Sequence, residues 1–476
     1  MRRSLCFIGA ALILIAPCIC FYASGAQTTE DLVVLSNIIA QYNLRAIEKS
    51  LDQETYKGEA GILRVRPEVG KDLGFRTMIT EGYQRAQDLM EQADKTFDKI
   101  VEKLKEKGRD GPSAKDIDRL LALAFAYNEK RTQATRLFSA YHKGLDPKDD
   151  QRLDEALCRA VMERELAKSL KRYQRNLRDS LADFYNRTYV GRELEPPLTP
   201  TNVDFVNLVF GRFVKRASPQ VLAGYDLDTF LLGPDSVKPA VWKLMFPPRL
   251  RTYGEIVERL YHEMRRPRYR VHPVLFMALM RRESNFDPTA ISDVGAAGLT
   301  QIMPGTARLL GMSSIYSPSY LHEAGVLLRQ ARQWRAKALG LIKDVGKGRG
   351  REKIEKAYSY MQKAMGLAAK SRALFNKYEK ELLRRGEDDR LDAEKAIKHG
   401  YTYFTRMLNK YKGDISLALA AYNAGPSRVK QYGGIPPFPE TVAFRNMVLR
   451  YYYEYLSRLG LSRWGEIEKA SRDLER

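Results

Sequence analysis

Apolar residues recur at helical spacing over most of this chain. Between Gly74 and Lys107 they alternate four and three positions apart, a heptad pattern formed by Ile79, Tyr83, Ala86, Met90, Ala93, Phe97, Ile100 and Leu104. After a break rich in Gly and Pro, Ser113 is placed to cap a second such helix, and a third runs to Phe184. This pattern predicts an up-down-up helical bundle within residues 27–190.

Two later segments differ from this bundle. Prolines interrupt residues 191–250, so we expect a linker of short helices there. Residues 313–390 are rich in charge and contain two amphipathic stretches, about 321–343 and 350–385, around a Gly-rich turn, which predict a helical hairpin inserted into the rest. Strand patterns are scarce, so the expected fold class is all-α, with the N-terminal bundle followed by a second helical domain over residues 251–476.

The stretch YRVHPVLFMALMRRESNFDP, residues 269–288, places a carboxylate at the end of an apolar helix. Pro273 suits the first helical position, and the polar residues and proline after Glu283 stop the helix. The helix dipole and burial both disfavour the charged form of Glu283, so we expect its pKa to be raised. Arg281 and Arg282 point to other faces of the helix, and their opposing effect should be smaller. A carboxyl group protonated near neutral pH fits a general acid for cleavage of a glycosidic bond.

Small residues follow this carboxylate. The sequence GAAG at residues 295–298 allows backbone to approach a ligand closely, as a sugar chain lying in a groove requires. Residues 417–429, LALAAYNAGPSRV, predict a small-residue helix that runs into a Gly-Pro break and carries Tyr422 and Asn423 to its end.

The motifs ESNFDPTAISDVGAAGLTQIMPGTA, ALAAYNAGPSRV and IPPFPETVAF follow in this order. Together they resemble the catalytic domain of the lytic transglycosylases with a goose-type lysozyme fold, the soluble-lytic-transglycosylase (SLT) type, over about residues 265–312 and 391–455. The resemblance implies cleavage of peptidoglycan glycan strands, with Glu283 as the single catalytic acid and base. It also implies a set of residues that line the cleft around the substrate: Ser292, Gln301, Met303, Tyr422, Asn423 and Glu440.

Three positions depart from the family pattern. Thr300 stands where the family usually has Met, Ala396 where it often has Asn, and Phe444 where the last motif usually ends in Tyr. The missing hydroxyl at Phe444 would remove one hydrogen bond to the substrate or to Glu283, but it leaves the acid itself in place.

A glycosidase with two carboxylates needs a second Asp or Glu across the scissile bond. Asp287 precedes a Pro turn and is expected to hydrogen-bond its own backbone instead. The resemblance implies that the substrate's N-acetyl group stabilises the anomeric carbon, and that the MurNAc-GlcNAc β-1,4 bond is cleaved without water to give a 1,6-anhydroMurNAc end. Two alternatives stay open: a hydrolytic muramidase on the same fold, and a non-catalytic wall-binding scaffold in which Phe444 and Ala396 mark a decayed site.

The N-terminus has the features of a secretory signal peptide. Arg2 and Arg3 precede an apolar run, and small residues lead up to Ala26, so residues 1–26 are expected to be removed on export. An uncleaved segment would instead serve as a membrane anchor. The expected location is the periplasm or cell envelope.

Charge and cysteine content narrow the partners. Lys and Arg number 80 against 58 Asp and Glu, a net charge of +22, which implies an acidic partner. An exported location excludes nucleic acid and favours peptidoglycan glycan strands, with cell-envelope proteins as further partners of the bundle or the hairpin. Three of the four cysteines lie within residues 1–26, and the helical context of Cys158 predicts a buried packing role. No Cys/His cluster has metal-ligand spacing, so we expect no metal and no cofactor.

Overall fold

The computed structural model describes residues 27–52, 55–106, 112–228, 242–264, 268–345 and 350–460. Within these ranges every regular element is a helix, and β pairing is limited to isolated bridges, so the predicted all-α fold class is confirmed. None of these helices combines the length and the apolar character that a membrane crossing requires. The predicted signal peptide, residues 1–26, lies outside the described residues.

The first half of the chain is a run of helices that begins at Gln27. In order they are α1 (Gln27–Asp52), α2 (Pro67–Asp72), α3 (Glu81–Lys105), α4 (Ala114–Lys143), η1 (Gln151–Leu153), α5 (Glu155–Arg172), α6 (Leu177–Tyr185), the π-helical turn η2 (Asn186–Val190), α7 (Val203–Arg216) and α8 (Pro219–Ala223). Ser113 caps α4 as predicted: its hydroxyl accepts from the backbone N–H of Asp116, and the Asp116 carboxylate accepts from the backbone N–H of Ser113. Thr80, Asp154 and Asn176 likewise cap the first turns of α3, α5 and α6 with their side chains.

These helices do not form the predicted up-down-up bundle. α3 and α4 pair as a long antiparallel hairpin, but α5 packs mainly against α1 and α6. Leu166 and Leu170 of α5 are buried in the same core cluster as Leu35 and Ile38 of α1. The heptad pattern identifies each helix but not the partner of the third, because periodicity shows which face is buried and not what covers it.

Residues 191–250 also differ from the expected linker of short helices. α7 is 14 residues long, since Pro200 and Pro219 fall outside it. Its side chains Val203, Phe205, Val206, Val209 and Phe213 are buried in the main core cluster. Residues 203–216 are therefore part of the main core cluster and not a linker, while residues 229–241 lie outside the described residues.

The second half places its helices around α11. In order they are η3 (Lys243–Met245), α10 (Pro248–Glu263), α11 (Pro273–Ser284), α12 (Pro304–Leu309), α13 (Ser319–Lys343), α14 (Gly350–Arg385), α15 (Ala393–Lys410), α16 (Ile415–Ala424), α17 (Pro426–Tyr432) and α18 (Pro439–Arg458). α11 packs against α10 and α18, and α16 packs against α15, α17 and α18. This arrangement surrounds α11 with protein along its length, which is why its apolar residues are buried on every face.

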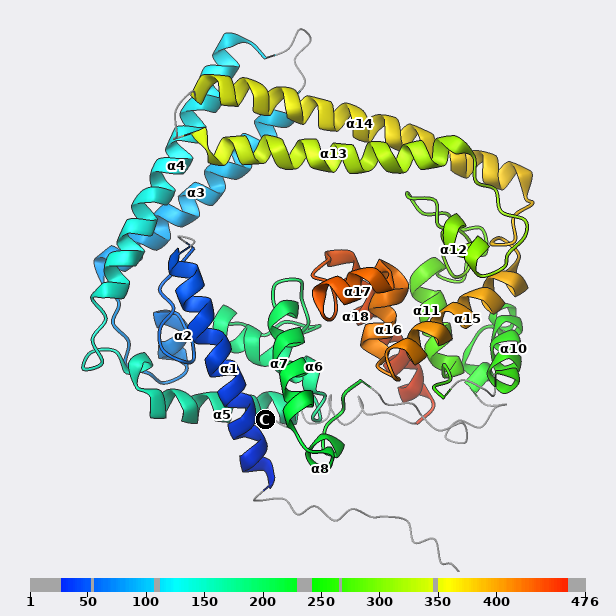
Figure 1. Ribbon diagram of the computed structural model, residues 1–476, viewed down its shortest axis with the longest axis horizontal. Coiled ribbons are helices and arrows are strands. Elements are labelled where there is room, and N and C mark those ends of the chain that lie inside the picture. Colours follow the sequence, from blue (N-terminus) through cyan, green and yellow to red (C-terminus); the bar gives the residue numbers. More distant parts are fainter. Residues whose placement is uncertain are drawn as a thin grey trace, which may run out of the picture.

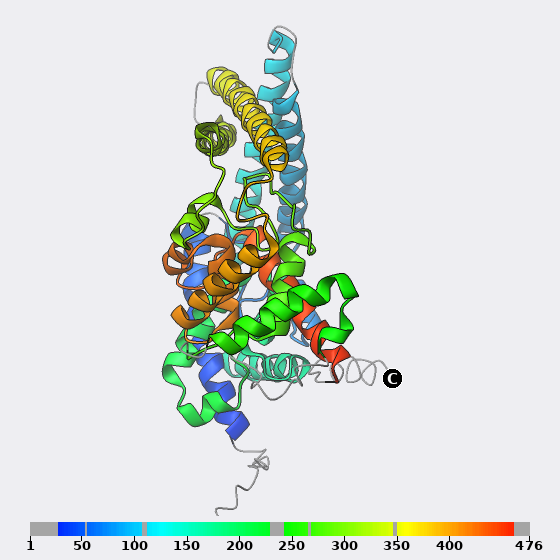
Figure 2. The same cartoon turned by 90° about the vertical axis from the view of Figure 1, so that its right-hand side faces the viewer.

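The predicted inserted hairpin is present as α13 and α14, with bounds close to those expected. Its base packs beside Ala297, and its far end meets the α3–α4 hairpin, so that the two hairpins and the two halves form a closed frame of helices (Figure 1). Figure 2 shows both hairpins projecting on the same side of the helical body. Where they meet, one buried cluster combines residues of both: Ala93, Ile100, Leu104, Ile117, Leu120, Ala124, Tyr127, Ala338, Ile342, Val345, Ile354, Ala357, Tyr358 and Met361.

Polar contacts also join the two hairpins. The Asn128 amide donates to the carbonyl of Ile342 at 3.1 Å, and the Tyr358 hydroxyl donates to the carbonyl of Glu106 at 2.9 Å. The sequence left open whether the insertion serves the glycan, a partner or packing. Its far end packs on the first half of the chain.

Candidate active site

Glu283 lies in the last turn of α11, whose side chains from Pro273 to Met280 are all buried. The helix ends at Ser284, one residue later than predicted, because Asn285 adopts a left-handed conformation with φ of 51°. The carboxyl group of Glu283 is therefore held at the C-terminal end of a helix that is itself fixed by the core.

The electrostatic surroundings of Glu283 favour its neutral form. Burial raises its pKa to about 8, the charge of Arg282 acts in the opposite direction, and the charge of Glu440 adds to the increase. Among the residues that the structure describes, none forms a hydrogen bond or an ion pair with this half-buried carboxyl group. The predicted direction of the pKa shift is confirmed.

The two arginines before Glu283 have separate contacts, as their positions on the helix predict. The Arg281 guanidinium lies 4.0 Å from the ring centroid of Tyr451 and 3.2 Å from a carboxylate oxygen of Glu454, both on α18. Arg282 lies over the ring of Phe444 at 5.8 Å. Neither guanidinium forms an ion pair with Glu283.

Tyr422, near the end of α16, lies beside this carboxyl group. Its burial and the charge of Glu283 both raise the pKa of its hydroxyl well above the usual value. The hydroxyl donates a hydrogen bond of 2.8 Å to the carbonyl of Thr300. Its ring is parallel to that of Phe444, with centroids 6.4 Å apart and planes within 2°. The side chain is thus packed as a core aromatic on one side and faces the candidate acid on the other.

Asn423 connects the end of α16 to the first turn of α18, where Glu440 lies. The Asn423 side-chain oxygen accepts a hydrogen bond of 2.8 Å from the hydroxyl of Thr441 in the first turn of α18. Glu440 precedes Thr441 and is exposed, with its charge within reach of Glu283. Gly425, with φ of 87°, makes the break between α16 and α17 that the Gly-Pro motif predicted.

Ser292 and Gln301 lie in the loop between α11 and α12. The Ser292 hydroxyl accepts from the backbone N–H of Ala296 at 3.0 Å. Gln301 has a left-handed backbone, and its amide donates to the carbonyls of Ala290 and Gly298, both at 2.9 Å. In this structure both side chains hold the shape of the loop.

The predicted site residues therefore fall into three groups. The first group contains Glu283, together with Tyr422 and Glu440, which interact with it electrostatically, and Asn423, which follows Tyr422 near the end of α16. Ser292 and Gln301 shape the loop opposite. Met303 precedes α12 and is 42% exposed, which leaves its side chain available as a wall for a ligand.

Two of the three departures from the family pattern touch each other. Thr300 is fully buried, and its hydroxyl donates a hydrogen bond of 3.0 Å to the carbonyl of Ala396. A β-carbon added to Gly400 would lie 2.6 Å from the Thr300 side chain, so α15 packs closely on this residue. The third departure, Phe444, is 1% exposed and packs on Tyr422. All three positions are filled by close packing.

A buried ion pair that sequence reasoning missed holds the loop in place. Arg390 and Asp388 are fully buried and 2.7 Å apart. The Arg390 guanidinium also donates to the carbonyl of Gly295 at 3.1 Å and to the hydroxyl of Tyr378, near the base of the inserted hairpin, at 2.6 Å. Arg390 thus fastens the loop of Ser292 to the hairpin. In the sequence, EDDR after a highly charged helix gives no sign of burial.

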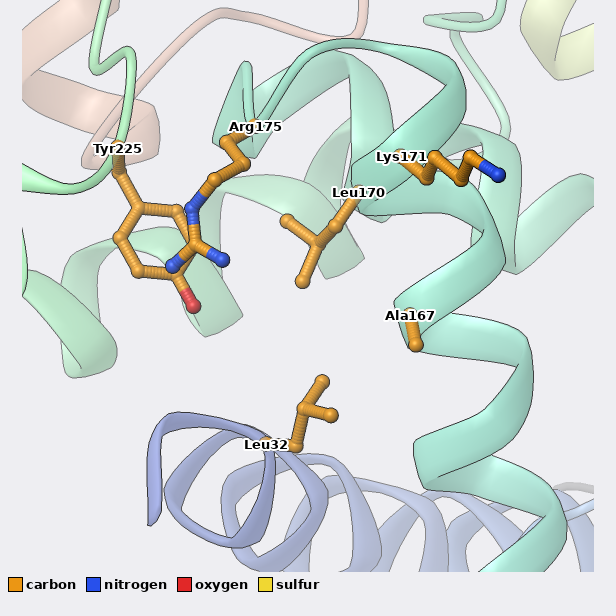
Figure 3. A pocket seen from close by; sticks show the side chains of 6 residues that line it. All are labelled: Leu32, Ala167, Leu170, Lys171, Arg175 and Tyr225. Carbon is orange, nitrogen blue, oxygen red and sulfur yellow. The ribbon is translucent and has the colours of Figure 1, made fainter. Parts of the chain in front are cut away.

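A small pocket elsewhere on the chain has no comparable chemistry. Figure 3 shows its lining between α1, α5 and the segment at Tyr225: Leu32, Ala167, Leu170, Lys171, Arg175 and Tyr225. The Arg175 guanidinium stacks on the Tyr225 ring, 4.2 Å from the ring centroid, and forms an ion pair with Asp31. Cys158 lies nearby in the sequence of α5; it is buried, and burial raises the pKa of its thiol to about 11, which confirms its predicted packing role.

Comparison with known protein families identifies the domain that carries Glu283. Residues 261–324 and 354–441 match the family model described as Transglycosylase SLT domain. The interval between the two blocks, residues 325–353, contains most of α13 and the first residues of α14, whereas residues 354–385 of α14 lie within the match. The second half of this chain therefore contains a region that matches the Transglycosylase SLT domain.

Individual relatives are similar over smaller or looser regions. A transglycosylase of Enterobacteria phage PRD1 is 38% identical over 63 residues, which are 13% of this chain and 24% of that protein, so the alignment spans about a quarter of the phage protein. The 70 kDa soluble lytic transglycosylase SLT70 of Escherichia coli has a TM-score of 0.29 and 16% identity, covering 91% of this chain and 72% of that chain. A lytic transglycosylase Slt of Pseudomonas aeruginosa, solved as an inactive mutant, has a TM-score of 0.27 and 16% identity, covering 92% and 59%. The domain assignment rests on the family model.

Proposed function

We propose that this protein is a peptidoglycan lytic transglycosylase that cleaves the MurNAc-GlcNAc β-1,4 bond and leaves 1,6-anhydroMurNAc ends. The observation that carries the proposal is the raised pKa of Glu283, to about 8, within a domain of the SLT family. A carboxyl group with this pKa holds its proton at neutral pH and can donate it to a leaving group.

The chemistry needs only one carboxylate from the protein. Glu283 donates its proton to the glycosidic oxygen as the bond between that oxygen and the anomeric carbon breaks, and the substrate's N-acetyl oxygen stabilises the anomeric carbon. The Glu283 carboxylate then takes the proton of the sugar's 6-hydroxyl while O6 bonds to the anomeric carbon. Glu283 loses one proton and regains one, and no water is consumed.

The nearest acidic side chain in the sequence supports a single-carboxylate reaction. The Asp287 carboxylate accepts from the backbone N–H of Thr289 at 2.8 Å and from its hydroxyl at 2.7 Å, so it caps its own turn, as the sequence predicted. Glu440 contributes charge from an exposed position and is suited to substrate contact. A two-carboxylate hydrolase would need a second acid held across the bond.

Three residues differ from the family pattern: Thr300, Ala396 and Phe444. Their packing favours a catalytic site over a decayed one. The Thr300 hydroxyl donates a hydrogen bond to the carbonyl of Ala396, and the Thr300 carbonyl accepts one from the Tyr422 hydroxyl. The changed residues therefore support the position of Tyr422. A scaffold without catalysis would not need this arrangement.

Location and partners follow from the substrate. We propose that residues 1–26 direct export to the periplasm or cell envelope. Without Arg2 and Arg3 the exported chain has 78 basic and 58 acidic residues, and this net charge of +20 favours an anionic polymer such as peptidoglycan. Cell-envelope proteins remain proposed partners of the two hairpins.

The products distinguish this function from its alternatives. Purified peptidoglycan incubated with the protein should yield muropeptides with anhydro ends, each lighter by one water than a hydrolysed end. Reducing MurNAc ends would identify a hydrolytic muramidase instead. Intact strands, with the protein bound, would indicate a wall-binding scaffold.

A further inference from the structure

We infer that residues 27–216 are a second, non-cleaving copy of the transglycosylase fold, and that the surface around Tyr42 in this copy binds a glycan strand. The inference rests on the proposed function for the identity of the strand. The two halves share the order of their elements. In both halves one helix is followed by a short helix that starts with Pro and then by a long antiparallel hairpin. Further packed helices come after the hairpin: α5, α6 and α7 in the first half, and α15, α16, α17 and α18 in the second.

The loop that shapes the candidate active site occurs twice. GEAGILRVRPEVGKDLGF, residues 58–75, corresponds to GAAGLTQIMPGTARLLGM, residues 295–312. Left-handed backbone falls at matching places in both loops, in the pairs Gly58 and Gly295, Gly61 and Gly298, and Arg64 and Gln301. The isolated bridge between Ala60 and Val65 also corresponds to that between Ala297 and Ile302. Non-glycine residues rarely adopt this conformation, so its recurrence at Arg64 and Gln301 is strong evidence of repeated structure.

The buried ion pair occurs twice as well. Arg152 and Asp150 are fully buried and 2.6 Å apart, as Arg390 and Asp388 are at 2.7 Å. Arg152 donates to the carbonyl of Gly58 at 2.9 Å, where Arg390 donates to Gly295 at 3.1 Å. Arg152 and Arg390 also each donate to a tyrosine hydroxyl of the preceding hairpin at 2.6 Å, that of Tyr141 in the first half and that of Tyr378 in the second.

The close packing behind this pair matches too. A β-carbon added to Gly61 would lie 1.6 Å from the carbonyl oxygen of Arg152, and one added to Gly298 would lie 1.7 Å from that of Arg390. Glycine is therefore required at both positions for the same reason. The α3–α4 hairpin is inserted in the first half where α13–α14 is inserted in the second, and the two equivalent insertions meet at their far ends.

The last helices complete the correspondence. Asn176 caps α6 as Asp414 caps α16. The ring of Phe184 on α6 stacks on Phe205 of α7 with centroids 6.4 Å apart, the same separation as between Tyr422 and Phe444. The first half thus has a phenylalanine, without a hydroxyl, where the active half has Tyr422.

The position of the acid can be located in the first half through a shared contact. The Ser284 hydroxyl donates to the carbonyl of Leu299 at 3.0 Å, and the Asn43 amide donates to the carbonyl of the equivalent Ile62 at 2.9 Å. Asn43 therefore corresponds to Ser284. The residue before it, Tyr42, stands where the active half has Glu283, so this copy lacks the general acid.

What remains around Tyr42 is a surface of aromatic and polar groups. Tyr42, Tyr185 and Tyr189 are half-buried, and their rings pack around Phe205 at centroid distances of 5.3, 5.3 and 5.7 Å. The Arg64 guanidinium lies 5.9 Å from the Tyr189 ring centroid. Tyrosine presents an apolar face and a hydroxyl, which suits a sugar ring with its apolar face and polar edge. The nearby Glu59 carboxylate accepts from the backbone N–H of Lys57 at 2.8 Å.

The test counts glycan sites on the full chain carrying Glu283→Gln. The probe is a set of peptide-free glycan oligosaccharides prepared from peptidoglycan, titrated by calorimetry. We expect two binding events per chain. Tyr42→Ala should weaken one of them at least tenfold and leave the other unchanged, while Leu44→Ala, at a 47% exposed position on the same helix, should change neither.

A second variant covers the possibility that Tyr42→Ala disturbs the fold. Arg64→Asn keeps a residue that tolerates the left-handed backbone and should also weaken the same event at least tenfold. A single binding event that neither substitution changes would overturn the inference and leave the proposed cleavage intact. Two events in a wild-type chain that does not cleave would support the second site and reject the proposed function. A chain that neither binds nor cleaves would contradict both.

Discussion

The hydroxyl of Tyr422 donates a hydrogen bond of 2.8 Å to the backbone carbonyl of Thr300, which joins α16 to the loop that contains Ser292 and Gln301. Thr300 is held from its other side by Ala396. The tyrosine beside the acid is thereby fixed to the backbone of the opposite wall, so movement of either wall would be transmitted to the other.

Removing this hydroxyl should reduce activity more than stability. We expect Tyr422→Phe to lower kcat about fivefold, since one hydrogen bond contributes about 1 kcal/mol and the ring packing on Phe444 is retained. Tyr403→Phe is the matched control, because its ring packs on Tyr422 at 5.3 Å. Equal effects of the two substitutions on kcat would mean that the Tyr422 hydroxyl has no special position.

The pH dependence of kcat should reflect the titration of Glu283. A general acid works in its protonated form, so kcat should fall as pH rises through about 8, the pKa of Glu283. Glu440→Gln removes a negative charge that raises this pKa, so the alkaline limb should move to lower pH. Glu454→Gln, on the same helix but paired with Arg281, should leave the limb in place. A limb unmoved by Glu440→Gln would show that Glu440 does not act on the acid.

The buried Arg390 should be essential to the active half. We expect Arg390→Met to lower the free energy of unfolding by about 3–5 kcal/mol, because it leaves Asp388 buried without its partner. Arg384→Met, exposed at the end of α14, should change it by less than about 0.5 kcal/mol. The double variant with Asp388→Asn should recover part of the loss. Equal stability of the Arg390 and Arg384 variants in denaturant titrations would contradict the role of Arg390.

Shortening the inserted hairpin should distinguish the role of its base from the role of its far end. Replacing residues 331–368 by a short Gly/Ser loop keeps Leu321, Phe375 and Tyr378, which pack beside Ala297. Turnover of short glycan fragments should survive, since the loop keeps its supports and a shorter connection carries little entropic cost. Stability should fall, because the apolar faces of α3 and α4 lose their cover. Loss of fragment turnover in a folded variant would place part of the far end in the catalytic step.

Much of the fold followed from local pattern. The bounds of α13 and α14 were predicted within two residues, since Gly and charged residues mark their ends. The partner of α5 was not predicted, because the same apolar stripe can pack on several neighbours. The likeness between the two halves was also not predicted: it lies mainly in left-handed turns and buried pairs, where few residue identities are required.

The site was predicted more fully than the contacts that support it. The apolar helix before Glu283 and the stop after it were enough to expect a raised pKa. Arg390 was missed because a charged pair in sequence is usually solvated, and only the packing of the hairpin base buries it. The loop-shaping hydrogen bonds of Ser292 and Gln301 depend on backbone conformations that residue type alone does not specify.

The most direct test of the account is the turnover of purified peptidoglycan by the Glu283→Gln variant. The amide keeps the shape of the side chain but cannot give up and regain a proton, so we expect turnover to fall by about 10²–10⁴-fold, while thermal unfolding and sedimentation with peptidoglycan stay close to those of the parent. Activity within tenfold of the parent, in a variant that folds and binds normally, would contradict the assignment of Glu283 as the catalytic acid and base.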